Sequence, residues 1–588
     1  MLIGILICAA LLIFYYGTIT FSLKFCGVNF IKILREEWQK IFLVAGISLL
    51  FIFFEVSLQQ TIYIWDSLET YEPTILCEEA TFSEPLQALK NLKYSINHLD
   101  YNFFLPMLMV LPMHIFGKSF LAYNFYVWIM FAIPAIFLTA AAIKTFLAEK
   151  LQTPVSCATI LFLLLIIPHF EVPLLIGYAN VSILLPGVII WLMLLNLDRE
   201  NFQRPRLVLI AVLSIFAVIQ SRTAAYMLIG CFAGYAAFIL YGTKNFRAEL
   251  KFLCKKFLFI GLTATALMSI IFFPFIKHAL TYDIGTAYSA YALGQNFFGK
   301  IFNHIAGIGL ILYVMFALGI VAVFFNNEVR PYFLFAAVWI AATVLLFCRV
   351  QNMGWQHFNI MLLPLSVVIV TVIAFCWKTL KKFAAVLILL LIVNFAQVFT
   401  GILPVQFNWV FLPPVRNDIA DLKNFVADLK EIAADRKIYF VASSGLYNAT
   451  TLQKISVPET HYALPNLIWT ADVDLRDGFP IEFFDADIVI VAEPVQIHLL
   501  PENQSVVVGV ADAMLNPTNF SAHFTLIKEQ NFYPAENESV TFKVYEKISP
   551  FDKSDIDIAE KYFEELYPYQ PKLFKNRFEQ YKKEHFGE

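Results

Sequence analysis

Long apolar runs, almost free of charged residues, recur from residue 1 to about residue 412. The twelve runs are roughly 2–23, 41–58, 120–143, 155–168, 180–197, 207–220, 224–241, 257–276, 305–325, 331–347, 359–377 and 383–402. A run of about 20 such residues crosses the hydrocarbon core of a bilayer, where each backbone polar group must be bonded within a helix. The composition agrees, because 59% of the 588 residues are hydrophobic and only 15% are charged. The sequence therefore predicts an α-helical polytopic membrane protein with about 12 spans.

Basic residues are distributed unevenly between the connections that join these runs. The connections after the odd-numbered runs are rich in Lys and Arg, and 24–40 and 242–256 are the clearest examples. The connections after the even-numbered runs contain few basic residues. Because cytoplasmic loops carry an excess of Lys and Arg, we expect a multi-pass protein of the cytoplasmic membrane. Segment 59–119 and the region after residue 412 are then extracytoplasmic.

The character of the chain changes at "FLPPVRND", where charged residues begin to appear regularly. Pro413 and Pro414 end any preceding helix, because proline lacks the N–H and restricts the residue before it. We therefore divide the chain into a membrane-embedded domain at 1–412, an extracytoplasmic α/β domain at 413–547 and a charged helical tail at 548–588. The abundance of Glu and Lys in the tail predicts that it is solvated.

The α/β domain is predicted from three kinds of pattern. "DIADLKNFVADLKEIAADR" has apolar residues at helical spacing, with Asp418 in position to cap the helix. "KIYFVAS" and "ADIVIVA" are short apolar runs typical of buried parallel strands, and the alternating "VTFKVYEKI" predicts an edge strand. The region has no GxGxxG, Walker or metal-ligand pattern. A packing or acceptor-docking module without chemistry is its simplest interpretation.

The first large outward loop, 59–119, begins with "YIWDSLETYE". Asp66 follows an apolar run directly, and Glu69 and Glu72 come next at about one helical turn each. Further on, "FFLPMLMVLPMHIF" at 103–116 is apolar but too short to span a bilayer, and two prolines interrupt it. Short apolar helices with aromatic faces tend to lie in the membrane interface. We therefore expect surface-lying helices in this loop.

The order of several motifs resembles the GT-C superfamily of membrane glycosyltransferases. An acid heads the first outward loop, and "LDYNFFLPMLMVLPMHIFG" corresponds to a surface stretch of that superfamily. "IQSRTAAYML" joins two apolar runs, and "QHFNIMLLPLS" begins a late one. The layout is similar in particular to the bacterial branch related to protein O-mannosyltransferases and lipid A aminoarabinose transferases, in which a C-terminal outward α/β domain is common. The resemblance covers most of 41–412.

The chain departs from that branch at two points. The branch often has two adjacent acids, whereas here Ser67 and Leu68 separate Asp66 from Glu69. Its surface stretch often contains a double proline, and this chain has Asp100-Tyr101-Asn102 there instead.

The resemblance implies an inverting transfer of a hexose or pentose from a polyprenyl phosphate to an acceptor in the cell envelope, which can be a lipid, a glycan or a protein. Such chemistry needs a carboxylate that takes the acceptor's proton and a cation that stabilises the departing phosphate. Asp66 and Glu69 are the candidate catalytic residues. The alternative for Asp66 is a solvated acid at the end of a span.

Arg222 is the first candidate for contact with the donor phosphate. It lies between two apolar runs, where a charged side chain is costly unless it meets water, an acid or a phosphate. A guanidinium grips phosphate in a bidentate manner, although Arg222 could also reach the surface by snorkelling. The other candidates for the phosphate are Arg349, His357 and Lys93. The candidates for the sugar or acceptor are His98, Asp100, Tyr101, Tyr282 and Tyr288, although an interfacial aromatic belt explains the tyrosines equally well.

No cofactor is predicted with certainty, and a divalent metal is possible because some GT-C enzymes use one. The expected partners are a polyprenyl-phosphate-linked sugar, the envelope acceptor and the membrane, and we expect no nucleic acid. Three alternatives remain: a polysaccharide polymerase or ligase, a transporter of lipid-linked glycans, and a non-catalytic GT-C-like scaffold. The early acid-headed loop favours the transferase over a polymerase. Ionisable residues predicted at span ends rather than within spans disfavour a transporter.

Overall fold

The computed structural model describes residues 1–588 except 60, 100, 149–154, 199–201, 404–405, 411, 456–462, 517–519 and 588. The chain forms two compact units. Unit 1 comprises Met1–Leu58, Asp66–Tyr282 and Phe297–Leu412, and unit 2 comprises Gln59–Trp65, Asp283–Asn296 and Pro413–Glu588. Two short segments from the first part of the chain thus pack with the C-terminal region.

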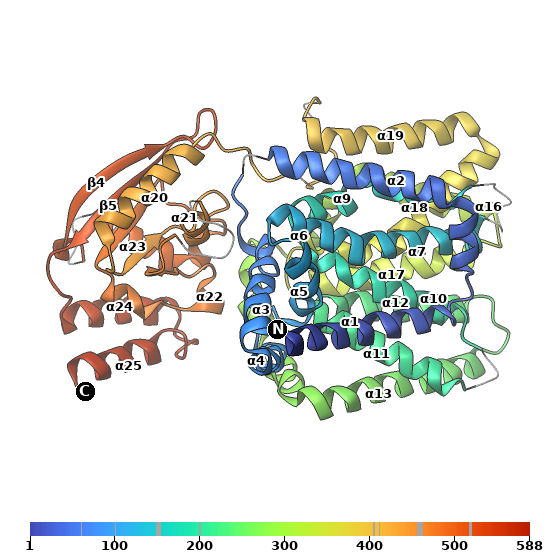
Figure 1. The fold of residues 1–588 in the computed structure, drawn as a ribbon, viewed down its shortest axis with the longest axis horizontal. Coiled ribbons are helices and arrows are strands. Elements are labelled where there is room, and N and C mark those ends of the chain that lie inside the picture. The colour runs from blue at the N-terminus through green and yellow to red at the C-terminus, as the bar shows by residue number, and fades with distance from the viewer. Residues whose placement is uncertain are drawn as a thin grey trace. The chain divides into compact units, whose positions relative to one another are not determined.

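Unit 1 is a helical bundle whose longer helices run along one common direction (Figure 1). From α1 to α10 its elements are α1 Leu2–Leu23, α2 Phe30–Leu58, α3 Tyr71–Ser83, α4 Pro85–His98, α5 Phe104–Phe116, α6 Phe120–Val127, η2 Trp128–Ala132, α7 Ile133–Ile143, η3 Lys144–Ala148, α8 Cys157–Leu165, α9 Pro168–Leu175, η4 Ala179–Ile183 and α10 Leu184–Leu195. The rest are α11 Arg204–Gln220, α12 Ala224–Leu240, α13 Phe246–Thr281, α15 Phe297–Ile308, α16 Leu310–Phe325, α17 Arg330–Cys348, η6 Trp355–Met361, α18 Leu362–Thr379 and α19 Lys381–Thr400. The short helix η1, Trp65–Ser67, lies at the junction of the units.

The polytopic helical fold predicted from the sequence is confirmed. Seven helices among the described residues are long and apolar enough to cross a membrane, or nine if each of two bent pairs counts as one span. The pairs are α8 with α9, bent by 64°, and α15 with α16, bent by 99°. Shorter apolar helices such as α10 and α12 account for part of the difference from twelve. A hydropathy pattern indicates the length of an apolar segment but does not show whether the helix within it is bent.

The sharper bend, between α15 and α16, occurs at Gly309, a position that cannot accommodate a Cβ atom. Gly309 has a φ of +102°, and a Cβ there would lie 2.3 Å from the carbonyl oxygen of Phe407. The Leu310 N–H donates to the same carbonyl, at 3.2 Å. The segment after α19 therefore passes directly beside the break and fixes it.

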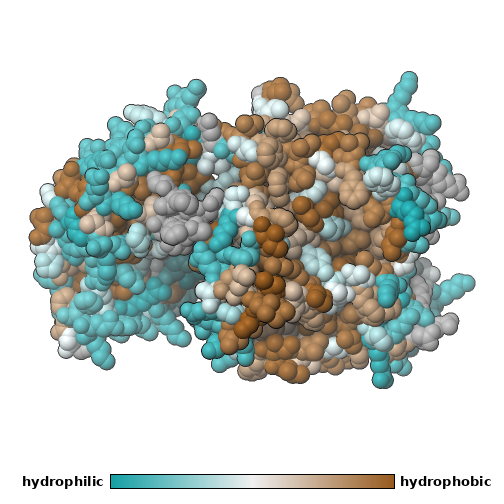
Figure 2. All heavy atoms as spheres, viewed as in Figure 1, coloured by the Kyte–Doolittle hydropathy of each residue, from teal (hydrophilic) through white to brown (hydrophobic). Residues whose placement is uncertain are grey.

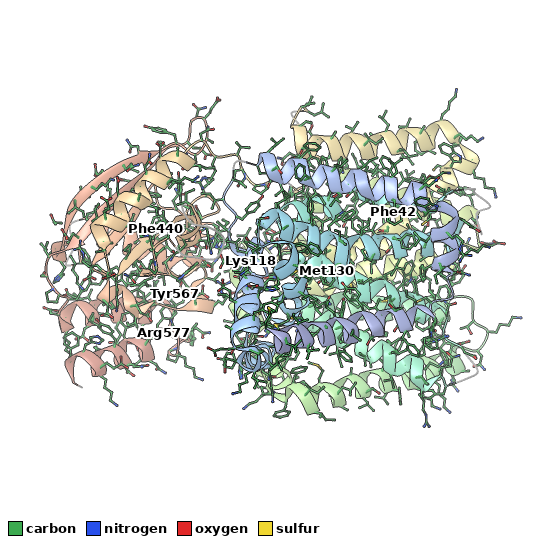
Figure 3. The ribbon with its side chains drawn as sticks, viewed as in Figure 1. Phe42, Lys118, Met130, Phe440, Tyr567 and Arg577 are labelled. Atoms are coloured by element: carbon green, nitrogen blue, oxygen red, sulfur yellow. The ribbon has the colours of Figure 1, made fainter. Side chains whose placement is uncertain are left out.

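The helices expose apolar side chains where a soluble bundle would be polar. On α2, Phe42 and Leu43 are about two-thirds exposed, at 63% and 64%, and Phe42 is labelled on this helix in Figure 3. Figure 2 shows hydrophobic residues over much of the visible face of unit 1, with hydrophilic residues toward the ends of the helices. This distribution is typical of a surface in contact with lipid.

The basic connections of unit 1 gather at one end of the bundle. Lys144, which begins η3, forms a 2.6 Å ion pair with Glu37 on α2. The Asn196 amide, after α10, donates to the carbonyl of Cys26, after α1. Arg206, at the start of α11, donates to the Asn196 carbonyl. The connections that the sequence places on the cytoplasmic side thus share one end.

Helix α5 differs from the surface-lying helix that the sequence predicts for 103–116. Eight of its residues are buried, from Phe104 to Val110 and at Met113, and it packs against α1 and α3. Helix α4, by contrast, is amphipathic and exposes Leu86 and Tyr94. An apolar run that is too short to span the membrane can lie on the membrane surface or be buried within the protein. Helix α5 is buried within the protein.

Unit 2 contains a five-stranded sheet in the order β2-β1-β3-β5-β4. The strands are β1 Ile438–Val441, β2 Leu467–Ile468, β3 Ile488–Glu493, β4 Phe524–Phe532 and β5 Val540–Lys547. Strand β1 is parallel to β2 and β3, whereas β5 is antiparallel to β3 and β4. The two predicted parallel strands are present, but "VTFKVYEKI" forms the inner strand β5. Strand β4 pairs with the outer side of β5 and is the edge of the sheet on that side. The alternating pattern of β5 therefore resembled that of an edge strand although β5 is an inner strand.

Helices cover both faces of this sheet (Figure 1). They are α20 Ile419–Ala433, α21 Ala449–Lys454, α22 Asp474–Asp477, α23 Ser505–Leu515, α24 Lys553–Leu566 and α25 Lys575–Phe586, with short helices α14 Ile284–Ala287, η5 Ser289–Ala292, η7 Ile481–Asp485, η8 Pro501–Asn503 and η9 Ser521–His523. Helix α20 packs Phe425 against Phe440 and Phe542 on one face. On the other face α23, α24 and α25 pack against β1 and β3.

Two predictions about unit 2 are corrected by its packing. The C-terminal tail is helical but not solvated, because Phe563 of α24 and Phe578 of α25 are buried in the core beneath the sheet. Arg577 also donates to the carbonyl of Phe479, at 3.0 Å (Figure 3). Asp418 occupies the N-cap position of α20 but does not cap it. Its buried carboxylate instead accepts hydrogen bonds from Arg416 and Tyr447.

Candidate functional site

Asp66 lies in η1, which follows the end of α2, whereas Glu37 and its ion pair with Lys144 lie near the start of that helix. The residue before it, Trp65, has a φ of +47°, in the left-handed region that non-glycine residues seldom adopt. Ser67 and Leu68 are buried, whereas the Asp66 side chain is half-buried. The turn therefore fixes the backbone and leaves the carboxylate accessible.

Three side chains of unit 1 interact with Asp66 by a hydrogen bond or electrostatically. The Tyr101 hydroxyl donates a 2.6 Å hydrogen bond to Oδ1. His357, in η6, interacts with Asp66 electrostatically. Burial and the nearby Asp66 charge raise the pKa of Tyr178 well above its usual value, and its hydroxyl bonds with Ser67. Tyr178 therefore keeps its proton, and Asp66 has two phenols and an imidazole as neighbours.

Arg222 is connected to Asp66 through the short segment Leu99–Asn102. Its Nη2 donates to the carbonyl of Leu99 at 2.9 Å. The Asn102 amide donates in turn to the carbonyl of Ile219, the residue near the end of α11, at 2.7 Å. Two hydrogen bonds thus attach this segment to the α11–α12 turn, while Tyr101 within it holds Asp66. Asp100, the fourth member of the segment, lies outside the described residues.

Arg349 and His357 belong to the same end of the bundle. Arg349 is the exposed residue that closes α17, and it interacts electrostatically with Tyr226 on α12. The ring of Phe347 lies between Tyr226 and His357, with centroids 5.2 Å from each. Of the predicted residues, Tyr101 and His357 interact with Asp66 directly, whereas Arg222 and Arg349 are linked to this end only through intervening residues.

The other predicted residues lie in different surroundings. Glu69 is exposed after η1. Lys93 and His98 are exposed on α4, where the His98 ring lies 4.7 Å from that of Tyr94 at a tilt of 37°. Tyr282 ends α13 with its ring on His278, at 4.8 Å. Tyr288 belongs to unit 2 and stacks on Tyr291.

Several ionisable residues that sequence reasoning did not select are buried in unit 1. Glu78 on α3 pairs with Lys118 and with His114, whose Nδ1 is 2.7 Å away (Figure 3 labels Lys118). The broken helix α9 buries Glu171, and α15 buries Lys300 and His304. The four-residue spacing of Lys300 and His304 was the available signal, since it places both on one helix face.

No group of three or more His, Cys, Asp or Glu side chains within the described ranges is arranged to hold a metal ion. Asp66 interacts with Tyr101, Tyr178 and His357 among the described residues. Such a site can accept one proton and stabilise one anion.

These features define a multi-pass helical membrane protein with a C-terminal α/β unit. Neither the protein-family models nor the curated proteins contain a match to the chain. Among solved structures it is similar to ArnT from Cupriavidus metallidurans, which was crystallised bound to undecaprenyl phosphate. The two share 11% identity with a TM-score of 0.44, over 85% of this chain and 97% of that one. No conclusion about the family or the activity of this chain follows from this likeness.

Proposed function

We propose that the protein is an inverting glycosyltransferase, which moves a sugar from a polyprenyl phosphate to a lipid, glycan or protein of the cell envelope. The observation that carries the proposal is the segment Leu99–Asn102, which holds Asp66 through Tyr101 and Arg222 through the Leu99 carbonyl. A proton acceptor and a phosphate-binding cation are thereby anchored to the same few residues. The reaction class itself comes from the resemblance to the GT-C superfamily.

Asp66 takes the acceptor's proton in this proposal. Tyr101 engages Oδ1, and Oδ2 receives no hydrogen bond from any described residue, so one oxygen is open to an acceptor hydroxyl. The tyrosine bond holds the carboxylate in one orientation, which a general base needs in order to reach its proton. Inversion follows when the deprotonated acceptor attacks the anomeric carbon from the side opposite the departing phosphate.

Cations at the same end of unit 1 support departure of the phosphate. Arg222 lies over Phe275, with its guanidinium carbon 5.5 Å from the ring centroid, and a planar guanidinium can bind phosphate in a bidentate manner. Arg349 is exposed close to Tyr226. Charge-assisted hydrogen bonds from guanidinium to phosphate oxygens are among the stronger ones in proteins. Arg222 and Arg349 are therefore assigned to the donor phosphate.

The proposed location is the cytoplasmic membrane, with the reaction at the outer leaflet. Glu37 and Cys26, which join the basic connections, lie near the start of α2 or before it, whereas Asp66 follows the other end of this helix. By the positive-inside rule the end with the basic connections is cytoplasmic. The C-terminal region follows the last predicted span and is then extracytoplasmic, as Asp66 is.

Transfer of polyprenyl-phosphate sugars in isolated membranes tests the proposal. Radiolabelled donors are compared for wild type, Asp66→Asn, Glu69→Gln and the control Glu84→Gln, an exposed acid at the start of α4 in the same loop. We expect Asp66→Asn alone to lose activity, by about a hundredfold or more. Loss only in Glu69→Gln would assign the base to Glu69. A wild type that uses no donor would refute the transferase.

A transporter of lipid-linked glycans is the second candidate, because one observation favours it. Two helix pairs are broken, and the broken helix α9 buries Glu171, whose Oε1 accepts a 2.6 Å bond from Ser48. Ionisable residues in broken helices are typical of transporters, and the sequence had placed Glu171 in a connection. Glu171→Gln separates the two functions: a transporter loses flux of the lipid-linked glycan, whereas a transferase with its base at Asp66 keeps its chemistry.

A further inference from the structure

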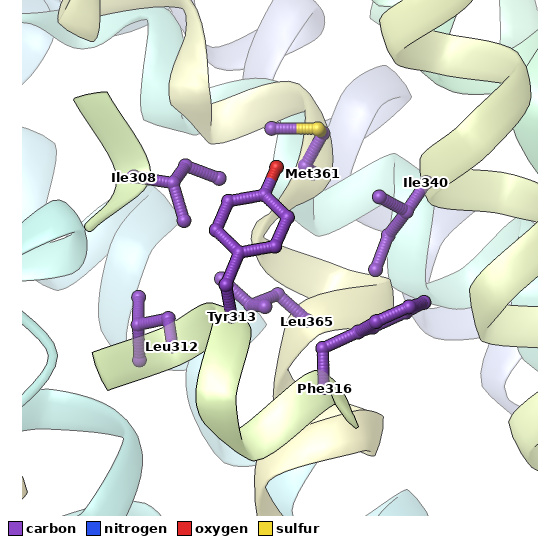
Figure 4. Close-up of a pocket in the computed structure, with 7 residues that line it drawn as sticks. All are labelled: Ile308, Leu312, Tyr313, Phe316, Ile340, Met361 and Leu365. Carbon is purple, nitrogen blue, oxygen red and sulfur yellow. The ribbon is translucent and has the colours of Figure 1, made fainter. Parts of the chain in front are cut away.

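A pocket in unit 1 lies beside α16 and is lined in part by Leu312, Tyr313, Phe316 and Leu365 (Figure 4). Its lining is apolar except for the Tyr313 hydroxyl, and it has room for about one water molecule. Such a pocket cannot hold a ligand larger than water. Polar and aromatic side chains gather instead at one edge of the sheet in unit 2.

The parallel strands of unit 2 reverse their order beside β1. Strand β1 pairs in parallel with β2 on one side and with β3 on the other. The helix that follows β1, α21, packs on the same face of the sheet as α20, whereas the helix that follows β3, α23, packs on the opposite face. Where the connections diverge in this way, open α/β sheets bind ligands outside the carboxyl ends of the strands. The carboxyl ends of β1 and β3 are therefore the expected place for a ligand.

Ser443 and His498 follow these two strands. The Ser443 N–H donates to the Gln496 carbonyl at 2.8 Å, so the strands remain paired up to this point. The His498 Nδ1 lies 2.8 Å from the Ser443 carbonyl, and because a carbonyl can only accept, Nδ1 carries the proton. Burial lowers the pKa of His498, so the ring is neutral at about pH 7. Nε2 then has a lone pair, and no described residue forms a hydrogen bond with it.

Asp472, which follows β2, and Arg476, on α22, bring opposite charges to the same cluster. The Asp472 Oδ1 accepts a 2.6 Å hydrogen bond from the Ser443 hydroxyl, and its Oδ2 lies 3.4 Å from the Arg476 Nη2. Arg476 also pairs with Asp477, at 2.6 Å. The side chains of Asp472 and Arg476 are 32% and 27% exposed. A carboxylate and a guanidinium are thus both within reach of a ligand from solvent.

Ser443, Asp472 and His498 are the residue types of a hydrolase triad, but their arrangement is different. In a triad the imidazole takes the proton of the serine hydroxyl. Here the hydroxyl donates to Asp472, and His498 bonds with the backbone carbonyl of Ser443 instead. Ser443 is also fully buried, at 0% exposure. The cluster is therefore suited to binding rather than to nucleophilic catalysis.

Two aromatic rings of unit 2 lie beside His498. The centroid of the Trp65 ring is 4.7 Å from that of His498, and the centroid of the Tyr291 ring is 6.3 Å from it. Tyr291 also interacts electrostatically with Arg476. Tyr288, which the sequence suggests for sugar binding, stacks on Tyr291 at 6.1 Å. The three aromatic side chains are half-buried, so each keeps part of its surface open to solvent.

We propose that this cluster is a carbohydrate-binding site of unit 2. The faces of a pyranose ring carry C–H groups that pack on aromatic rings, and its rim carries hydroxyls that both donate and accept hydrogen bonds. Trp65 and Tyr291 supply the rings, and the His498 Nε2 accepts from one hydroxyl. Asp472 accepts from another hydroxyl, and Arg476 donates. A sugar binds to such a surface from solvent and needs no enclosed cavity.

The glycan has two possible sources, which are the acceptor of the proposed transfer and another glycan of the cell envelope. Trp65 directly precedes Asp66 in the chain, which favours the acceptor. That assignment rests on the proposed function, whereas the binding site itself does not depend on it.

Isothermal titration calorimetry of the full chain in nanodiscs tests the site. The probes are oligomers of N-acetylglucosamine, oligomers of mannose and the oligosaccharide of deacylated lipopolysaccharide, with a serine-rich peptide that carries no sugar for comparison. We expect wild type to bind at least one oligosaccharide and not the peptide. Tyr291→Ala should weaken that binding about tenfold or more, because the ring contact is lost, and Tyr291→Phe, which keeps the ring, should weaken it less. The matched control Tyr533→Ala, at an exposed tyrosine that follows β4, should bind as wild type does.

Asp472→Asn provides a second variant, because asparagine has a similar size and can still accept the bond from Ser443. It is expected to weaken oligosaccharide binding about threefold to tenfold. Limited proteolysis shows whether each variant is folded. A wild type that binds none of the oligosaccharides, or binds the peptide equally well, would overturn the site. Unchanged binding by Tyr291→Ala would do so too, or by Asp472→Asn where Tyr291→Ala does not fold.

Sugar transfer in membranes assigns the source of the glycan. A higher KM of Tyr291→Ala for the acceptor would assign the site to the acceptor, whereas an unchanged KM would assign it to a glycan that does not react. A wild type that binds an oligosaccharide but transfers no sugar would keep this site and refute the glycosyltransferase. Transfer by a wild type that binds no oligosaccharide would refute this site and keep the glycosyltransferase.

Discussion

The hydroxyl of Tyr101 donates a 2.6 Å hydrogen bond to Oδ1 of Asp66, across 35 positions of sequence. Sequence reasoning assigned Tyr101 to the sugar or acceptor, and the contact gives it a second role as the residue that orients the carboxylate. An oriented carboxylate has one oxygen committed and one free. In the proposed reaction, this pair leaves Oδ2 to meet the acceptor.

Tyr101→Phe is expected to lower the rate of sugar transfer about tenfold, with little effect on the amount of folded protein. The hydroxyl is lost but the ring is kept, and Tyr101 is 39% exposed, so packing changes little. Steady-state transfer in membranes measures it, with the exposed Tyr94→Phe on α4 as the control. If kcat is unchanged and only KM for the acceptor rises, Tyr101 binds the acceptor rather than orienting Asp66.

Arg222→Gln is expected to lower kcat/KM for the donor at least tenfold, and Arg222→Lys is expected to lower it less. The glutamine loses both the charge and the bidentate grip, whereas lysine keeps the charge. The matched control is Arg204→Gln, because Arg204 is the exposed first residue of α11 and lies among the basic connections.

Donor titrations with membranes of equal protein content measure the Arg222 series. Full activity of Arg222→Gln would mean that the arginine only anchors the Leu99 carbonyl. The order of the three proteins separates the two roles further. A structural anchor tolerates lysine no better than glutamine, because neither can repeat the Nη2 bond at the same reach.

The membrane fold was predictable from sequence because its signal is strong and local. Apolar runs reveal helices, and the alternation of basic connections correctly grouped the loops that Lys144, Glu37 and Asn196 join at one end. The bends at Gly309 and before α9 were not predictable, since each depends on packing against a distant segment. Burial of α5 was missed for the same reason.

The functional roles of the candidate residues stay predictions, and the structure adds the contacts that join them to their neighbours. Asp66, Arg222 and His357 were selected by their positions at span ends. The hydrogen bonds through Leu99 and Asn102 were not, because backbone carbonyls leave no mark in a sequence. Lys300 and His304 were passed over because hydropathy places them at the edge of a span, and only side-chain burial reveals that they face inward.

The region around His498 in unit 2 is expected to loosen as pH falls from 7 to 5. The His498 Nδ1 is 2.8 Å from the carbonyl of Ser443. Burial lowers the pKa of His498, and the charge of Arg476 acts in the same direction. The Ser443 carbonyl, Asp472 and Asp477 oppose this shift but do not cancel it. The folded state thus binds the proton less readily than the unfolded state does. Its stability is full above the ordinary histidine pKa, about 6.5, and declines below it.

Hydrogen exchange of the full chain measures this loosening in peptides that cover Gln496–Gln504. The ring of Trp65 lies 4.7 Å from that of His498, and 59–65 belongs to the same unit. Hydrogen exchange of the peptide that contains Trp65 therefore provides a second measurement of the loosening. His498→Gln is expected to abolish most of the pH dependence. His278, a histidine in unit 1, gives the control variant His278→Gln, which should leave the exchange of 496–504 and its pH dependence as in wild type. Exchange that accelerates equally in His498→Gln would assign the effect to other groups.

The C-terminal helices are expected to be essential to the stability of unit 2, contrary to a solvated tail. Phe563 of α24 is 3% exposed and its ring packs on Phe479, at 4.8 Å, and on Phe574, at 5.6 Å. Phe563→Ala should therefore destabilise the unit by about 3–5 kcal/mol, the usual cost of such a cavity. Tyr569→Ala, at a residue 92% exposed between the two helices, is the matched control. Limited proteolysis of the purified chain measures the difference: faster cleavage throughout 413–588 is expected only for Phe563→Ala, and equal resistance of the two variants would mean that α24 contributes little to the core.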